Sequence, residues 1–487
     1  MRRGSVIGPL ILIGIGALFL LRNLWPEIPL VELISRYWPF VLIAWGGIRL
    51  IEILLAAIMA KPLPRNGVSG GEWMLVFLIS IVGATMYTAH NYTSWFPTSN
   101  AWRRMVVGGM GETYDYTLAP VEKPCAKNCR VLIESFRGNA KINGVTDATS
   151  VKASGQETIR SFQQADANKA SEQTPLELIQ QGDQIIVRTN QDKASDRTQP
   201  TADLEITVPA GSSVEAHGRY GDFDVQNVAG DVEVSSDNAG VRLENVGGNV
   251  RIDLGRSDVV RAVGVKGNVD LKGRGQDLEL QDITGQVNVN ATYVGQIQLR
   301  NLMKPLRYES SQTTLSAEKV PGQLHMNLGE LTADNIVGPV RISGRSRDVQ
   351  LSNFSQSLDL TLDRGDVELR PGKTLPKMEV HSRSGDIELA LPPGAKFDLR
   401  ASTARGDAEN DYGDPLKVEQ YGHGQTISGG TGGGGPELRL DTGRGSISVR
   451  KATAEDVTFP SIPSPPAPPK PPAAPDAPKP SLKVEHE

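Results

Sequence analysis

The chain has little of what enzymes and metal proteins use for chemistry. Its 487 residues include two cysteines and six histidines, and aromatic residues make up only 5%. No P-loop, Gly-x-Ser-x-Gly or dinucleotide-binding motif is present. Lys and Arg (51) nearly balance Asp and Glu (56) without a basic block, so nucleic acid is not an expected partner. No metal-ligand spacing occurs among His90, His217, His325, His381, His423 and His486. We therefore expect no catalytic residue, cofactor or metal site.

Long apolar runs occur only near the N-terminus. Residues 6–24, 38–60 and 73–89 each approach the roughly 17–25 residues that cross a bilayer as a helix. No small-residue cleavage site follows the first run, which argues against a signal peptide. We predict three transmembrane helices that contact lipid, in a multi-pass protein of the bacterial inner membrane. Its N-terminus would be cytoplasmic and its C-terminal part extracytoplasmic.

Two residue pairs are candidate sites. Arg49 and Glu52 lie three residues apart in the second predicted span, so they share a helix face. They form either an internal ion pair or a contact between helices. Cys125 and Cys129 are predicted to form a disulfide in an oxidising compartment, with free thiols as the alternative. Two cysteines alone make a poor zinc site, because zinc takes four ligands or three plus water.

What the sequence does contain is a β-repeat. Gly230, Gly248, Gly267 and Gly285 each open a strand in which Val, Ile or Leu alternates with polar residues, at spacings of 18, 19 and 18 residues. Strands arrive about every nine to ten residues, so two strands make one coil. We expect glycine to supply a positive φ at the corners and Asp or Asn to bond its own backbone there. The predicted turn glycines are Gly221, Gly230, Gly248, Gly267, Gly285, Gly365 and Gly385.

The expected organisation is a mainly β protein with four parts. Residues 1–90 form the transmembrane region, 91–130 a linker with the cysteine pair, 131–452 a β-solenoid, and 453–487 a disordered tail. Within the solenoid, residues 155–182 have no strong strand pattern and predict a helix or a polar excursion. The tail holds 11 of the 32 prolines between Pro460 and Pro480, a composition that forms no packed core.

Two segments carry a family resemblance. Ser382–Ala395 (SRSGDIELALPPGA) and Val208–Val225 (VPAGSSVEAHGRYGDFDV) resemble the bacterial β-strand-repeat family called putative adhesin, over roughly residues 130–450. That resemblance implies a β-helix-like solenoid and not an enzyme. Gly8–Leu24 and Tyr37–Leu50 resemble the transmembrane hairpin of Lia-type cell-envelope-stress proteins, which implies a sensing or inhibitory role in the envelope.

These observations favour a non-catalytic adhesion or interaction module of the cell envelope. The solvent-exposed faces of its strands would bind an envelope protein or a glycan. The alternative is a regulatory membrane protein that relays envelope state. A third possibility is a β-helix enzyme that acts on acidic polysaccharides, with its charged residues on one exposed sheet. The candidates for that sheet are Asp222, Asp224, Asp231, Glu233, Arg242, Glu244, Arg251 and Asp253. Calcium binding is a weak alternative, because the Gly-Gly-x-Gly-x-Asp register is missing.

Overall fold

The computed structural model describes residues 111–195 and 197–453, and the helical residues 40, 42–43, 45–47, 51, 76–77 and 80–81. Within these residues, no helix combines the length and the apolar character that a membrane crossing requires. This finding corrects the predicted fold class, which included three transmembrane helices, and the predicted multi-pass inner-membrane location. The described chain is mainly β.

Several sequence predictions fall outside the described residues. They are the range 6–24, most of 38–60 and 73–89, the Arg49–Glu52 pair, the hairpin similar to Lia-type proteins, the linker up to residue 110 and the tail from residue 454. Within the range 91–130, expected to be a linker and lead-in, the structure has the strand that starts at Glu112.

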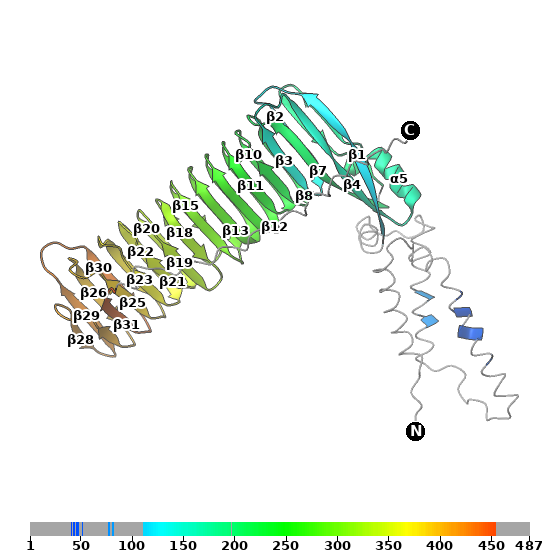
Figure 1. Ribbon diagram of the computed structural model, residues 1–487. Helices are drawn as coiled ribbons and strands as arrows, with labels where there is room; N and C mark the ends of the chain where they lie inside the picture. Colours follow the sequence, from blue (N-terminus) through cyan, green and yellow to red (C-terminus); the bar gives the residue numbers. More distant parts are fainter. Residues whose placement is uncertain are drawn as a thin grey trace, which may run out of the picture.

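Two sheets enclose one continuous apolar core (Figure 1). Sheet A contains, in spatial order, β5 (Glu177–Gln181), β6 (Gln184–Arg188), β2 (Arg130–Arg137), β8 (Ser213–Tyr220), β10 (Val232–Asn238), the first halves of β12 (Val250–Val265) and β13 (Val269–Ile283), β14 (Val287–Tyr293), β16 (Leu306–Glu309), β17 (Thr313–Ala317), β20 (Val340–Ser346), β22 (Ser357–Arg364), β24 (Lys377–Ser382), β30 (Glu437–Thr442), β26 (Asp398–Thr403), β29 (Gly424–Gly430) and β28 (Lys417–Tyr421).

Sheet B lies on the other side of the core, and β12 and β13 bend around the corner to join both sheets. It contains β1 (Glu112–Pro124), β4 (Ser150–Ser161), β7 (Thr198–Pro209), β3 (Ala140–Val145), β9 (Phe223–Gln226), β11 (Val241–Val246), the second halves of β12 and β13, β15 (Ile297–Leu302), β18 (Val320–Met326), β19 (Glu330–Asp334), β21 (Asp348–Ser352), β23 (Val367–Arg370), β25 (Ile387–Leu391), β31 (Ile447–Lys451) and β27 (Ala408–Asn410).

From β8 to β16 each coil lies directly on the coil before it in the chain; we call these the regular coils. Val232 pairs with Val250, Val250 with Val269, and Val269 with Val287, all in parallel strands. These registers agree with the 18, 19 and 18 residues read from the sequence. In β10, Val232 and Val234 are buried whereas Glu233 faces out, because successive side chains of a strand point to opposite faces.

The corner glycines are needed for two different reasons. Gly221, Gly365 and Gly385 have φ of 115°, 132° and 145°, which L side chains rarely adopt. The glycines at the entry to sheet A have no such φ. There an added Cβ would overlap the backbone of the preceding coil. A Cβ on Gly267 would meet the backbone of Gly248, and a Cβ on Gly285 would meet that of Gly267. At Gly230, Gly248, Gly267 and Gly285 the requirement is therefore close stacking of coils, not the expected positive φ.

The Asp and Asn residues that follow these glycines bond the next coil and not their own backbone. Each side-chain oxygen accepts the backbone N–H of the equivalent residue one coil further on. The pairs are Asp231 with Asn249 (2.6 Å), Asn249 with Asn268 (3.0 Å) and Asn268 with Gln286 (2.9 Å). A second ladder of the same kind, at the entry to sheet B, runs near the C-terminus from Asp348 through Asp366 to Asp386 (2.9 Å each). The corners are thus hydrogen-bonded along the stack.

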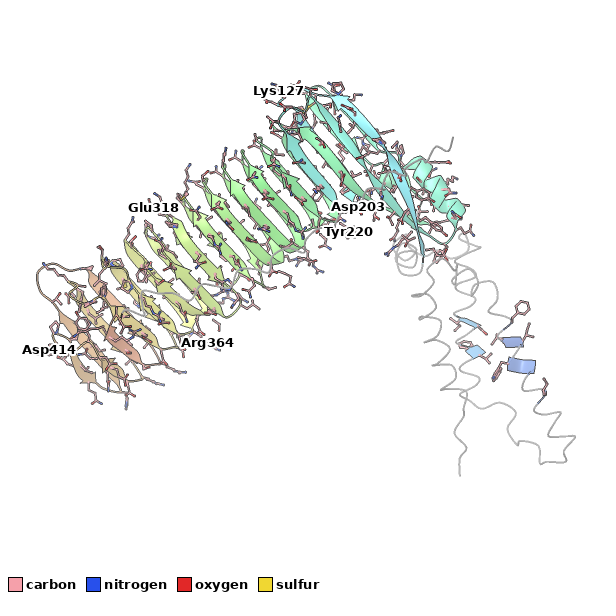
Figure 2. The ribbon with its side chains drawn as sticks, viewed as in Figure 1. Lys127, Asp203, Tyr220, Glu318, Arg364 and Asp414 are labelled. Atoms are coloured by element: carbon pink, nitrogen blue, oxygen red, sulfur yellow. A yellow bond between two sulfur atoms is a disulfide. The ribbon has the colours of Figure 1, made fainter. Side chains whose placement is uncertain are left out.

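One coil runs in the opposite direction. β17 pairs antiparallel with β16 and β20, and β18 pairs antiparallel with β15 and β19. Figure 2 shows the consequence. Tyr220 and Arg364 lie on one long edge of the stack, where the chain passes from sheet A to sheet B, whereas Glu318, between β17 and β18, lies on the opposite edge. This reversal explains why the repeat spacing loosens after Glu309.

At both ends the chain leaves the stack and returns to it. β2 and β3 lie between the N-terminal cap (β1, β4–β7, α5, η1) and the next coil, β8 and β9. Likewise, β30 and β31 insert between β24–β25 and the C-terminal cap (β26–β29). Antiparallel pairs such as β26–β29 continue sheet A beyond the last coil, which protects an edge that would otherwise invite aggregation.

The N-terminal cap includes the two remaining elements of the described chain, the helix α5 (Gln164–Gln173) and the 3-10 helix η1 (Gln191–Lys193). Of the range 155–182, the sequence predicted the helix but not the strand on either side of it. Cys125 and Cys129 form a disulfide that closes the turn between β1 and β2.

Candidate interaction surface

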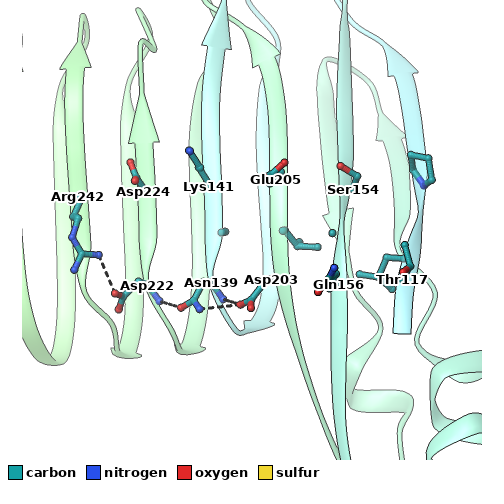
Figure 3. A pocket seen from close by; sticks show the side chains of 15 residues that line it. Thr117, Asn139, Lys141, Ser154, Gln156, Asp203, Glu205, Asp222, Asp224 and Arg242 are labelled. Atoms are coloured by element: carbon teal, nitrogen blue, oxygen red, sulfur yellow. Dashed lines mark hydrogen bonds and ion pairs between the residues drawn. The ribbon is translucent and has the colours of Figure 1, made fainter. Parts of the chain in front are cut away.

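A groove of about 730 Å³ crosses sheet B where the N-terminal cap meets the regular coils (Figure 3). β1 shifts its register against β4 between Leu118 and Val121, and Gly155 leaves no room for a side chain above the Asp203 carbonyl. The groove is lined by Thr117, Leu118, Pro120, Asn139, Ala140, Lys141, Ser154, Gly155, Gln156, Asp203, Leu204, Glu205, Asp222, Asp224 and Arg242. We call it the N-terminal groove.

Charges of alternating sign form a row across the N-terminal groove. Lys141 on β3 lies in register between Glu205 on β7 and Asp224 on β9, and Asp224 is in register with Arg242 on β11. Figure 3 shows these side chains on four neighbouring strands. Cross-strand pairs of opposite charge favour this order of strands.

A second row fixes the lower edge of the groove. Asn139 donates its backbone N–H (3.2 Å) and its Nδ2 (2.9 Å) to Asp203 Oδ1, and its Oδ1 accepts the N–H of Asp222 (2.9 Å). Asp222 also accepts the N–H of Gly240 and a hydrogen bond from Arg242 Nη1, both at 2.9 Å. Asp203 and Asp222 are therefore each held in place by more than one donor at this edge of the groove.

The structure separates the eight charged residues that the sequence grouped as a catalytic ladder. Asp222, Asp224, Arg242 and Glu244 belong to sheet B, whereas Asp231, Glu233, Arg251 and Asp253 belong to sheet A. Glu233 pairs with Arg251 across two strands at 4.0 Å, on the opposite side of the core from Arg242. One polysaccharide chain on one sheet cannot meet all eight side chains.

A second groove, of about 510 Å³, lies on sheet A at the C-terminal cap. His381 Nδ1 is 3.3 Å from Asp441 Oδ2, and Ser402 donates its hydroxyl to Asp441 Oδ1. In a nucleophilic serine site the hydroxyl would bond the imidazole, which acts as the base. Here it bonds the carboxylate, so the three residues form a polar row and not a relay for covalent catalysis.

Sheet A carries a further cluster at β2 and β8. Glu215 accepts hydrogen bonds from His217 Nε2 at 2.8 Å and Arg130 Nη2 at 2.5 Å. The hydrogen bond from His217 and the interaction with Arg130 hold the pKa of the Glu215 carboxyl below its usual value. Glu215 is therefore a charged anchor between neighbouring strands.

Sequence reasoning missed a row of left-handed residues at the end of the sheet B strands. Asn227, Asn245, Asp282, Asn301, Asn335 and Asn353 all have φ between 49° and 58°. Several bond along the stack, for example Asn245 Nδ2 to Asn227 Oδ1 (3.2 Å). The signal was present, because Asn or Asp precedes an apolar residue at each of these positions, at spacings of 18–19 residues along most of the row.

No metal centre is apparent in the part of the chain that the structure describes, since no three His, Cys, Asp or Glu side chains there are arranged to hold an ion. The carboxylates at the corners accept backbone N–H groups instead, as Asp222 and Asp231 do.

A family model described as Toastrack DUF4097 matches residues 141–450, more than half of the chain. The chain belongs to the Toastrack DUF4097 family. The matched range covers the stacked coils and all of the C-terminal cap, and it starts inside β3. No curated protein matches this Toastrack chain.

One solved structure is similar to the Toastrack chain. It is the crystal structure of a putative cell adhesion protein from Clostridium sporogenes ATCC 15579, which aligns over 69% of this chain and 100% of its own at 8% identity. The TM-score is 0.15, so this likeness carries no argument about fold or function.

Proposed function

We propose that this Toastrack protein is a non-catalytic interaction module of adhesion type, and that it binds a partner along the N-terminal groove. The observation that carries the proposal is the groove itself, an open surface on which charged side chains from several strands lie in rows. Four carboxylates (Asp203, Glu205, Asp222 and Asp224) face two cations (Lys141 and Arg242). The excess of negative charge favours a partner that presents Lys or Arg.

The rest of the surface supports a polar mode of binding. In residues 111–453, as far as they are described, the exposed large apolar side chains are single and scattered: Val145, Tyr220, Val294, Met303, Leu328 and Val418. An interface built mainly on apolar burial would need a contiguous patch. A charged, hydrated contact is salt-dependent, so the affinity for the partner should fall as salt rises.

Binding experiments on the whole protein test this function. The protein is presented to Lys-rich and acid-rich peptides and to neutral and acidic glycans, at two salt concentrations. The groove variant combines Glu205→Gln with Asp224→Asn, and the matched control, Glu233→Gln with Asp253→Asn, removes two carboxylates from sheet A. We expect binding of the Lys-rich peptide to weaken by about tenfold in the groove variant and to stay unchanged in the control.

Three results would overturn the proposal. Release of a product from any polysaccharide would make the protein an enzyme. Equal loss of binding in the groove variant and the control would place the binding surface elsewhere. Binding to a glycan that is insensitive to both changes would likewise exclude the N-terminal groove as the site.

A further inference from the structure

A single buried carboxyl group lies at the N-terminal end of the core. Glu157 on β4 is fully buried, and it faces the same side of the strand as the buried Ile159. On this side α5 lies against β4 with Ala167 and Ala170, which form a small apolar cluster with Ile159. Tyr114 and Tyr116 of β1 complete the cluster. The carboxyl group is therefore enclosed between the cap sheet and α5.

The hydrogen bonds around Glu157 satisfy an ionised carboxylate poorly. Thr174, the C-cap of α5, has its Oγ1 2.9 Å from Glu157 Oε2 and 2.9 Å from the Ala170 carbonyl oxygen. A hydroxyl has one proton to donate. If Thr174 donates it to Ala170, only a protonated Glu157 can complete the second hydrogen bond, by donating to Thr174. The other carboxyl oxygen, Oε1, has no hydrogen-bond partner in the described structure.

No charged side chain compensates an ionised Glu157. On β1 the residue in register is Tyr116, whose phenol is titratable but neutral, and on β7 it is Ala202. The pKa of Tyr116 is raised by burial and by the charge of Glu157. The ionisable residues of α5 and η1 are exposed or half-exposed, and none forms an ion pair with Glu157 in the described structure: Asp166, Lys169, Glu172, Asp192 and Lys193. Burial raises the pKa of Glu157 to about 7, an effect that the hydrogen bond with Thr174 offsets only in part.

Few contacts hold α5 in place. Its buried side chains are two alanines, and its N-cap residue, Gln163, makes no side-chain capping hydrogen bond. A hydrogen bond from the Tyr116 hydroxyl to Asn168 Oδ1 (2.7 Å) joins it to β1. A helix of ten residues is not stable alone in water, so its position depends on this docking.

We propose that α5 is a pH-dependent cover of the N-terminal cap, docked while Glu157 carries a proton and released when Glu157 ionises. The direction follows from the proton balance. Docking raises the proton affinity of Glu157, so its contribution is complete below the ordinary pKa of 4.5 and is lost as the pH rises through about 7. Between pH 5.5 and 8.5 the docking equilibrium should fall by about 30-fold.

Hydrogen exchange on the whole protein tests this cover, after correction for the intrinsic pH dependence of exchange. We expect the protection of amides 164–173 to fall by about 30-fold between pH 5.5 and 8.5, while the amides of β10–β14 keep theirs. Glu157→Gln, a neutral side chain of the same size, should remove the pH dependence. Glu172→Gln, on the exposed side of α5, should leave it as in the wild type.

Three outcomes would overturn the cover. They are pH-independent protection of α5 in the wild type, the same pH dependence in Glu157→Gln, and a loss of protection that extends equally to β10–β14. The protection of β10–β14 also reports whether each variant is folded. A failure here leaves the groove hypothesis intact, because Gln156 and Ser154, which line the groove, lie on the opposite face of β4 from Glu157.

Discussion

In the regular coils each strand pair lies on the pair that precedes it in the chain, whereas at both ends the chain leaves the stack and inserts a coil on its return. The middle is parallel and repeats the same corner chemistry. The ends add antiparallel pairs such as β1–β4 and β26–β29, and they contain the two grooves described above. The contrast shows that stacking is supplied by the repeat, while these two grooves lie where the repeat is interrupted.

The regular coils and the N-terminal cap also differ in which polar residues they bury. From β10 to β16 they are Ser236 and Ser257. In the N-terminal cap the buried polar residues include Glu157, Thr174, Thr189, Asn190 and Gln191. Gln191 hydrogen-bonds both the N–H and the carbonyl of Arg137 on the inserted strand β2, at 2.8 and 2.7 Å. Where the chain returns to the stack, some backbone N–H and C=O groups have no hydrogen-bond partner in a neighbouring coil. Side chains supply those hydrogen bonds instead.

The largest effect is expected at a corner of the regular coils. Gly267→Ala would place a Cβ on the carbonyl oxygen of Gly248, so the two coils must separate. We expect a loss of about 3 kcal/mol in the free energy of unfolding, measured by denaturant titration. Gly329→Ala is the control, since its Cβ would meet no atom closer than 3.9 Å. If both changes cost the same, close stacking is not what these glycines provide.

Reduction of the disulfide tests the N-terminal cap alone. Cys125 and Cys129 are four residues apart, and closing so short a loop contributes roughly 2 kcal/mol. The double variant Cys125→Ser/Cys129→Ser should lose protection from hydrogen exchange in β1 and β2. The regular coils should keep theirs, because contacts in a solenoid are made between neighbours. A uniform loss along the chain would show that the cap and the coils unfold as one unit.

A smaller effect is expected from the corner ladder. Asn249→Ala removes the oxygen that accepts the N–H of Asn268, which should cost about 1 kcal/mol. Asn290→Ala, on the exposed face of β14, should cost no more than a few tenths. Thermal unfolding of the two variants side by side checks the difference. Equal midpoints would mean that water replaces the ladder at no cost.

The smallest effect concerns the Glu215 cluster between β2 and β8. Because the pKa of Glu215 is lowered, its contribution is present above the ordinary pKa of 4.5 and is lost as the pH falls through the lower folded value. Glu215→Gln should therefore destabilise the protein by about 0.5 kcal/mol at pH 7 and by less at pH 3. Denaturant midpoints at the two pH values decide this. An equal cost at pH 3 would point to packing and not to charge.

The sequence predicted the coil and its period correctly. The alternation of buried and exposed residues and the corner glycine every 18–19 residues can both be read directly from the sequence. It placed the corner glycines but gave the wrong reason for four of them, since the overlap of Gly267 with Gly248 exists only between stacked coils. It also overlooked the row of left-handed Asn and Asp residues, which are 18–19 residues apart in three of the five steps.

The candidate site was harder to predict. Sequence alternation indicates that Glu233 and Arg242 both face water, but it does not say that they lie on opposite sheets. The N-terminal groove joins residues as far apart as Thr117 and Arg242. Its floor depends on β3 being inserted between β7 and β9, an order that no local pattern encodes.

The sequence by itself determined the coil length, the inward and outward faces of each strand and the corner residues, because these depend on contacts that recur with the repeat. Only the tertiary structure decided which strands share a sheet, where one coil reverses, and how each end is closed. Those features depend on contacts between segments that are far apart in the sequence, and such contacts produce no periodic sequence pattern. The burial of Glu157 beneath α5 is of this second kind: its neighbours Tyr116, Thr174 and Ala202 come from three different elements, brought together only by the fold.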